Sequence, residues 1–408
     1  MTMPELRFKS NELLREVSLS EVGNFYGGLS GKTKSDFGFG DSKFITYMNV
    51  FTNTIAKQDM CDLVMVGANE KQNLVVDGDI LFTQSSETPE EVGMASVWTY
   101  KQKVYLNSFS FGLRVKNKQN VDPVYLTYLL RSPAYRKRIS IQAQGISRYN
   151  LSSSRLSTLK VKIPTLEEQQ KIAAFLTALD EKILLIDKTI ASLNDLKRGL
   201  MDRLFKRRVR FNGKDGTTFG KWRLSTIGAE GTFYYGKSAP KWSLSDTATT
   251  PCIRYGDLYT KHEYVVKDVD TYTEIEREKL VFSKGGEVLV PRVGEDPLDF
   301  CKCAYLPMKN IAIGEMISVY ETDNDGLYIS YYFNSQMKKT FAKYVEGGNV
   351  SNLYYTYLEG IELEVPTIDE QKRISDFLSV LIEKIDVNKN KKEKYVTLKR
   401  AFMQQMFV

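Results

Sequence analysis

A block of 42 residues occurs twice in this 408-residue chain, and it constrains the fold more than any other feature. Residues Pro164–Phe205 have the sequence PTLEEQQKIAAFLTALDEKILLIDKTIASLNDLKRGLMDRLF, and Pro366–Phe407 have PTIDEQKRISDFLSVLIEKIDVNKNKKEKYVTLKRAFMQQMF. The offset is 202 residues (366 − 164 = 407 − 205 = 202), with 16 identities and no gap. A repeat at about half the chain length predicts a duplicated protein, in which two similar globular units are each followed by the same long helix.

Each copy of the block is predicted to be a helix that begins with a capping box. Thr165 or Thr367 is the expected N-cap, and Glu168 or Glu370 follows three residues later. Apolar residues then alternate by four and three positions, which predicts a coiled-coil seam. The first seam comprises Ile172, Leu176, Leu179, Ile183, Ile186, Ile190 and Leu193. The second seam turns polar in its middle and comprises Ile374, Leu378, Leu381, Ile385, Asn388, Lys392 and Tyr395.

A seam on a helix of about 40 residues, which is about 60 Å long, cannot stay exposed to water. The simplest partner for each helix is the other copy, because unrelated core helices would not share this sequence. Since a folded domain lies between the copies, we expect an antiparallel coiled coil with pseudo-two-fold symmetry that holds one domain at each end. The polar positions of the second seam would disfavour alternative registers.

Weaker similarity extends into the sequence before each block. GDILF (Gly78–Phe82) corresponds to GEVLV (Gly286–Val290), and β-branched or aromatic runs bounded by glycines predict strands. Helices are predicted at Tyr125–Ala143 and Tyr328–Tyr344. Each unit is therefore expected to have a mixed α/β (α+β) fold. The predicted domains and helices are residues 1–163, 164–206, 207–365 and 366–408.

The distribution of charge along the chain suggests a polyanionic partner but does not by itself select one over a solvated surface. The net charge is +7, and basic residues cluster at 203–210 and 389–394. A solvated helix face or linker is the alternative explanation of these clusters. Four irregularly spaced cysteines do not form a disulfide framework, and we find no signal peptide or apolar run of about 20 residues. These features predict a cytoplasmic protein with no membrane partner.

No catalytic, cofactor-binding or metal-binding residues are predicted. The single histidine, His262, has no local motif around it, and Cys301-Lys302-Cys303 lacks the second ligand pair of a zinc site. The GGLSGKT segment at 27–33 has Tyr26 where a P-loop needs glycine. A binding protein is favoured over an enzyme.

The order of domain, helix, divergent domain and second helix resembles the specificity subunit of type I restriction–modification systems. The resemblance covers essentially the whole chain. It is carried by PELRF (Pro4–Phe8), IPTLEEQQKI (Ile163–Ile172), VPTIDEQKRI (Val365–Ile374) and the LKRxxMxxxF tails (Leu196–Phe205 and Leu398–Phe407).

This resemblance implies a function without chemistry in the chain itself. In the family, two target-recognition domains each recognise half of a bipartite site in double-stranded DNA, and the helices set the spacing and dock methyltransferase subunits. Two methyltransferase subunits and further restriction subunits are the implied partners. S-adenosylmethionine, ATP and Mg²⁺ are expected on those subunits, so no cofactor is expected in this chain.

Two polar loops in each unit fit the residue types that hold phosphates and recognise base edges. The candidate DNA-binding residues are Lys32, Thr33, Lys34, Arg148, Tyr149, Asn150, Lys237, Ser238, Lys241, Arg254, Arg292, Asn349 and Asn352. Any one of them could instead be a solvated turn residue. The alternative function is a non-catalytic coiled-coil scaffold with two protein-binding α/β domains.

Overall fold

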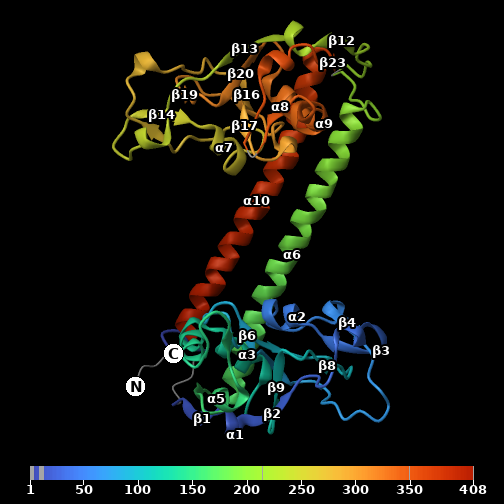
Figure 1. The fold of residues 1–408 in the computed structure, drawn as a ribbon, viewed down its shortest axis with the longest axis vertical. Coiled ribbons are helices and arrows are strands. Elements are labelled where there is room, and N and C mark those ends of the chain that lie inside the picture. Colours follow the sequence, from blue (N-terminus) through green and yellow to red (C-terminus); the bar gives the residue numbers. More distant parts are fainter. Residues whose placement is uncertain (1–3, 9–12, 214, 349, 408) are drawn as a thin grey trace. The chain divides into compact units, whose positions relative to one another are not determined.

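The computed structural model describes residues 4–8, 13–213, 215–348 and 350–407 (Figure 1). Contacts divide the chain into two compact units. Unit 1 consists of Met1–Asp187 and Asn390–Val408, and unit 2 consists of Lys188–Lys389. Two long helices, α6 (Leu166–Phe205) and α10 (Ile368–Met406), each run from one unit into the other.

Unit 1 is built on a four-stranded antiparallel sheet with the strand order β2-β9-β5-β7. A second sheet has the order β4-β3-β8, and two short pairs, β1-β11 and β10-β6, complete the unit. Its strands are β1 (Arg15–Ser18), β2 (Gly23–Gly27), β3 (Phe37–Ile45), β4 (Cys61–Val64), β5 (Ile80–Thr83), β6 (Ser85–Ser86), β7 (Ala95–Val97), β8 (Tyr105–Leu106), β9 (Ser110–Val115), β10 (Tyr149–Asn150) and β11 (Lys160–Ile163). Its short helices are α1 (Leu19–Val22), α2 (Tyr47–Thr52), α3 (Pro123–Arg131), α4 (Pro133–Ser140) and α5 (Ser153–Ser157).

Unit 2 repeats this topology. Its main sheet has the order β13-β20-β16-β18, its second sheet is β15-β14-β19, and β12 pairs with β23 as β1 pairs with β11. The strands are β12 (Arg223–Thr226), β13 (Gly231–Tyr235), β14 (Thr250–Ile253), β15 (Tyr272–Thr273), β16 (Glu287–Pro291), β17 (Val293–Gly294), β18 (Ala304–Leu306), β19 (Ala312–Ile313), β20 (Ile317–Thr322), β21 (Glu346–Gly347), β22 (Ser351–Asn352) and β23 (Glu362–Val365). The short helices are α7 (Tyr255–Thr260), α8 (Gly326–Gln336) and α9 (Lys338–Ala342). The mixed fold class and its duplication are thereby confirmed.

Each predicted domain helix is in fact two helices. In unit 1 the break lies at Ser132, whose backbone is extended (φ −68°, ψ 152°) because the next residue is Pro133. Ser132 ends α3 and precedes the first turn of α4. In unit 2 the same region divides into α8 and α9 at Met337.

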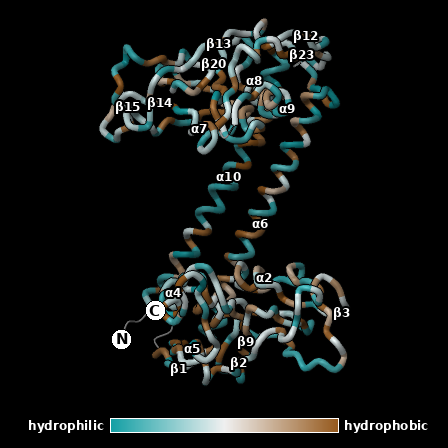
Figure 2. The backbone as a smooth tube through the Cα atoms, in the orientation of Figure 1, coloured by the Kyte–Doolittle hydropathy of each residue, from teal (hydrophilic) through white to brown (hydrophobic). Residues whose placement is uncertain are grey.

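The two long helices pair in antiparallel fashion inside each unit. In unit 1 the first half of α6 meets the last part of α10, where Phe175 and Phe402 rings lie 4.9 Å apart and Lys399 Nζ lies 2.5 Å from Asp180 Oδ1. In unit 2 the end of α6 and the start of α10 contribute to one core, which contains Met201, Leu204, Phe205, Ile374, Leu378 and Ile382. Figure 2 shows hydrophobic segments alternating with hydrophilic ones along both helices.

The polar middle of the second seam faces the other helix in part. Lys392 Nζ lies 2.7 Å from Asp187 Oδ1 on α6. Asn388 instead donates to the Lys384 carbonyl oxygen of its own helix at 2.8 Å. The ion pair ties α10 to one position along α6, which is the effect expected of a polar residue in a seam.

The glutamine of each repeated motif fastens a long helix to its domain. Gln169 is fully buried, accepts from the Asp122 backbone N–H at 2.9 Å and donates to the Asn120 carbonyl oxygen at 3.1 Å. Gln371 likewise accepts from the Asp325 N–H at 2.8 Å. Because Asp122 and Asp325 cap α3 and α8, each glutamine locks the helix start of its domain.

The adjacent glutamates bind arginines, and among the described residues neither has a hydrogen bond to the threonine at the start of its helix, which corrects the predicted capping boxes. Glu168 accepts from Arg7 Nε at 3.0 Å, and Glu370 accepts from Arg210 Nε at 2.9 Å. Glu370 also accepts from the Trp222 indole N–H at 3.0 Å. Only 1% of Glu370 is exposed, and a buried carboxylate needs hydrogen-bond donors, which Arg210 and Trp222 supply.

Candidate nucleic-acid interface

The first predicted loop of unit 1 lies between β2 and β3. Lys32 Nζ donates to Glu70 Oε1 at 2.6 Å, and only 3% of the lysine side chain is exposed. This hydrogen bond, with others from Gly67 and Gln72, lowers the pKa of Glu70 to about 2. Lys32 therefore ties the loop to the domain and does not present its charge to solvent.

The next residues of this loop form a short turn. The Thr33 N–H and hydroxyl donate to Asp36 Oδ2 at 2.7 and 2.9 Å, and these bonds lower the pKa of Asp36. Lys34 is exposed within the turn. Of the three predicted residues here, Lys34 is the one whose charge faces solvent.

The corresponding loop of unit 2 follows β13. Lys237 and Lys241 are exposed, and so is 80% of Trp242. Ser238 has a left-handed backbone (φ 66°), and its carbonyl oxygen accepts from the Glu315 N–H at 3.2 Å. This loop presents two cations and a large aromatic ring, the combination that holds phosphates and stacks on bases.

The second predicted loop of unit 1 is a tight hairpin. Gln144 and Asn150 exchange backbone hydrogen bonds of 2.9 and 2.7 Å. Gly145 has φ 137°, and a Cβ there would lie 2.0 Å from the Arg148 carbonyl oxygen, so the turn needs glycine. Ile146 is 95% exposed at the hairpin tip, next to an exposed Arg148.

This hairpin borders a groove of about 550 Å³ in unit 1. Tyr149 and Asn150 pair with Ser86 and Ser85 of β6, which places Arg148 at the groove edge. The groove is lined by Tyr47, Met48, Phe51, Ser85, Ser86, Glu87, Glu91, Phe109, Ser147 and Arg148. Polar and exposed apolar side chains thus meet at one edge of the unit.

Unit 2 has the matching hairpin. Glu346 and Gly347 of β21 pair with β22, and Asn352 of β22 pairs with Val293 of β17. Gly347 has φ 123°, and a Cβ there would lie 2.8 Å from the Val350 carbonyl oxygen. Asn349 lies outside the described residues.

The two predicted arginines of unit 2 have different surroundings. Arg254 precedes α7, and its backbone N–H donates to Asp257 Oδ2 at 2.9 Å. The Arg292 guanidinium lies 4.6 Å from the Tyr235 ring centroid and 5.4 Å from that of Tyr354. Its Nε is buried without a hydrogen-bond partner among the described residues. Because Leu353 donates to the Arg292 carbonyl oxygen, Arg292 lies beside the hairpin that contains Asn352.

One exposed residue at this edge was missed from the sequence. Gln84 lies between β5 and β6 in unit 1, and its neighbours Thr83 and Ser85 are buried. The similarity of GDILF to GEVLV, extended by two residues, would have aligned Gln84 with Arg292 (84 − 82 = 292 − 290).

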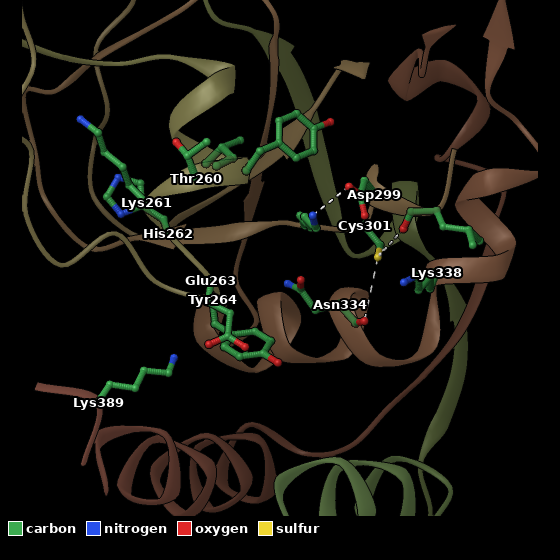
Figure 3. A pocket seen from close by; sticks show the side chains of 14 residues that line it. Thr260, Lys261, His262, Glu263, Tyr264, Asp299, Cys301, Asn334, Lys338 and Lys389 are labelled. Carbon is green, nitrogen blue, oxygen red and sulfur yellow. Dashed lines mark hydrogen bonds and ion pairs between the residues drawn. The ribbon is translucent and has the colours of Figure 1, made fainter. Parts of the chain in front are cut away.

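The single histidine lines a pocket of about 450 Å³ in unit 2, together with several lysines and Cys301 (Figure 3). Burial lowers the pKa of His262. Burial raises the pKa of the Cys301 thiol to about 11, and its Sγ donates to the Leu298 carbonyl oxygen at 3.4 Å. A thiol with this pKa is protonated at neutral pH and is a poor nucleophile.

Within residues 4–8, 13–213, 215–348 and 350–407, no group of three or more His, Cys, Asp or Glu side chains could hold a metal ion. Over the same residues, no helix has the length and apolar character needed to span a bilayer.

Comparison with known proteins identifies similar sequences and folds. The family model for the type I restriction modification DNA specificity domain matches residues 11–195 and 231–396. The putative type I restriction enzyme MjaX specificity subunit of Methanocaldococcus jannaschii is 26% identical over 358 residues, which cover 82% of this chain and 78% of that protein. The MjaVIII specificity subunit of the same organism is 23% identical over 365 residues, or 83% and 80% of the two chains.

A solved structure has the same fold. The crystal structure of the type I restriction–modification system S subunit from M. genitalium aligns with a TM-score of 0.63 at 13% identity, covering 100% of this chain and 99% of that chain. At this identity the likeness concerns the fold alone.

Proposed function

Because the chain belongs to the type I restriction modification DNA specificity family, we propose that it selects the DNA target of a type I complex. In this proposal each unit recognises one half of a bipartite site in double-stranded DNA. The two half-sites differ in sequence because the two units differ where they are exposed.

The observation that carries this proposal is a repeated framework with different exposed edges. Both units have the same strand order in the main sheet and the same glycine-dependent hairpin, which pairs with the short strand β6 in unit 1 and β17 in unit 2. The side chains at those edges are not repeated: the hairpin tip has Ile146 in unit 1 and Gly348 in unit 2. A duplicated scaffold with different polar edges suits recognition of two different short sequences.

The long helices would set the spacing and dock methyltransferase subunits. Apolar side chains remain exposed on them outside the seam, including Leu184 (38%), Val380 (67%) and Val387 (57%). Val380 and Val387 are seven residues apart and so lie on one face of α10, and exposed apolar side chains gathered on one face favour a protein partner. Two methyltransferase subunits, one for each unit, and additional restriction subunits would complete the complex.

Chemistry in this proposal belongs to the partner subunits. The protonated Cys301 thiol and the half-buried His262 do not form an activated pair, and S-adenosylmethionine, ATP and Mg²⁺ would bind elsewhere in the complex. The chain would thus be the non-catalytic part of a methyltransferase and endonuclease.

Sequencing of methylated genomic DNA tests the proposal directly. The full chain is expressed with the methyltransferase subunits of its system in a host that lacks its own adenine methylation. We expect one bipartite methylated motif that disappears when this chain is omitted. An identical methylation pattern with and without the chain would rule the function out.

Salt dependence separates this proposal from a protein-binding scaffold. DNA binding by the assembled complex should weaken log-linearly with salt, with a slope of about −0.9 for each phosphate contact. A complex that assembles but does not bind DNA at low salt would favour the scaffold.

A further inference from the structure

Gln84 of unit 1 and Arg292 of unit 2 occupy the same place in the repeated fold. Each is the residue between a central strand of the main sheet and the short strand that pairs with the hairpin. The Gln84 N–H donates to the Phe109 carbonyl oxygen at 2.9 Å, and the Arg292 N–H donates to that of Met316 at 3.0 Å.

The carbonyl oxygens of the two residues are matched as well. Leu151 donates its N–H to the Gln84 oxygen at 2.8 Å, and Leu353 donates to the Arg292 oxygen at 2.9 Å. Leu151 and Leu353 each follow directly after the hairpin strand, β10 or β22. The backbone therefore presents both side chains from an equivalent position beside the hairpin.

The surroundings of the two side chains differ, because aromatic rings contact the longer Arg292 side chain. Arg292 is held between the rings of Tyr235 and Tyr354. The corresponding residues of unit 1 are Gly27 at the end of β2 and Ser152 (235 − 27 = 292 − 84 = 208; 354 − 152 = 353 − 151 = 202). The guanidinium is thus oriented by stacking, whereas the shorter Gln84 side chain is exposed.

Glutamine and arginine are the side chains that recognise different purines in the major groove. Glutamine forms two hydrogen bonds with N6 and N7 of adenine, and arginine forms two with O6 and N7 of guanine. Because Arg292 Nε is buried, its two terminal nitrogens are the donors that remain to face a base. The geometry points to a matched specificity position, resting on the proposed function, at which Gln84 recognises adenine in one half-site and Arg292 recognises guanine in the other.

Exchange of the residue types tests this position. The full chain carrying Gln84→Arg, Gln84→Ala, Arg292→Gln or Arg292→Ala is expressed with its methyltransferase subunits, and the methylated motif is sequenced. Gln84→Arg should replace adenine by guanine at one position of one half-site, with discrimination between the two bases changed by about 5- to 100-fold. The alanine variants should make that position degenerate and leave the rest of the motif unchanged.

Gln119→Arg is the matched control, because it adds the same charge at an exposed residue of unit 1 that lies between β9 and α3 and outside the hairpin. Its motif should equal that of the wild type. If the complex with Gln84→Arg methylates no DNA, the motif of the Gln84→Ala complex tests the position instead, since this substitution adds neither charge nor bulk.

Two results would overturn the assignment while leaving the proposed function intact. One is a wild-type motif from both alanine variants. The other is an Arg292→Ala complex that binds every DNA sequence more weakly by the same factor, which indicates a phosphate contact. Absence of any bipartite motif with the wild-type chain would instead refute the proposed function itself.

Discussion

The two units share a backbone but use it differently at their exposed edges. In unit 1 the first loop buries Lys32 against Glu70, whereas unit 2 exposes Lys237, Lys241 and Trp242 at the same place. The sheet order is unchanged between them. Sheet and helix packing need the right apolar pattern, so the frame tolerates wide sequence change, and the exposed side chains at the edges are less constrained by packing than the core.

Substitution of the buried glutamates, Glu168 and Glu370, should produce the largest loss of stability. The two losses compare how each long helix is attached to its unit. Glu370→Ala leaves the buried Trp222 indole N–H without its acceptor and leaves the Arg210 guanidinium with the Gly220 carbonyl oxygen as its other acceptor. We expect unit 2 to lose about 2–3 kcal/mol, reduced from the fully buried case because Arg210 is 30% exposed. Glu168→Ala should cost unit 1 less, since among the described residues Glu168 accepts from the Arg7 guanidinium and from no indole. Hydrogen exchange measured peptide by peptide assigns each loss to its unit, and equal losses would contradict the comparison.

Substitution of the hairpin glycines tests whether both edges depend on the same turn. Gly145→Ala should cost about 1–3 kcal/mol of local stability, and Gly347→Ala should cost less. The reason is that a Cβ meets a carbonyl oxygen at 2.0 Å in the first case and at 2.8 Å in the second. Amide hydrogen-exchange rates in residues 144–150 and 350–352 measure the local stability. The affinity for DNA molecules that carry a base change in one half-site or the other shows which half-site each hairpin affects. Gly199→Ala, on α6 with open space around it, is the control.

Lys32 and Lys34 of unit 1 allow a charge with a structural role to be compared with a charge that is proposed to face DNA. Lys34→Ala should make the slope of log affinity against log salt less negative by about 0.9, as expected for one lost phosphate contact. Lys32→Ala should leave that slope unchanged, because its charge is already paired with Glu70. A filter-binding or anisotropy titration between low and physiological salt measures both. Equal changes in slope would show that the ion pair opens on binding.

The loss of stability at low pH should be the smallest of these effects, and it should be similar in both units. Glu70 in unit 1 and Glu230 in unit 2 each have a pKa of about 2, below the ordinary value of 4.5. For Glu230, burial raises the pKa, but hydrogen bonds from Arg223, Ser225 and Asn324 more than offset this.

A depressed carboxylate pKa stabilises the fold above the unfolded value, and this contribution is lost as the pH falls from about 4.5 through about 2. In Glu70→Gln and Glu230→Gln the free energy of unfolding should therefore depend less on pH over this range than in the wild type. Denaturant titrations at several pH values measure this dependence. Glu87→Gln, at an exposed position, should follow the wild type. The same curve for all four proteins would contradict the assigned ion pairs.

Much of the frame could be predicted from the sequence because it depends on local periodicity. The heptad seam places Leu176 and Leu378 in the two cores, where both are fully buried. The constant offset of the repeat also indicated the duplicated topology. The capping boxes were wrong because Glu168 and Glu370 find stronger partners, Arg7 and Arg210, about 160 residues away.

The candidate interface was less predictable for the same reason. The sequence indicated the two polar loops of each unit, but it could not show that Lys32 is neutralised by Glu70. Nor could it place Arg292 between two tyrosines that are 57 and 62 residues away (292 − 235 = 57; 354 − 292 = 62).

By itself, the sequence determined the duplication, the two long helices and the polar character of the loops, because residue spacing and composition carry these properties. Only the tertiary structure decided which charges remain available and which aligned residues of the two units lie beside the hairpins. Availability depends on partners that folding brings together, and the place of Gln84 and Arg292 beside the hairpins depends on their backbone hydrogen bonds to Leu151 and Leu353. Neither can be read from neighbours along the chain.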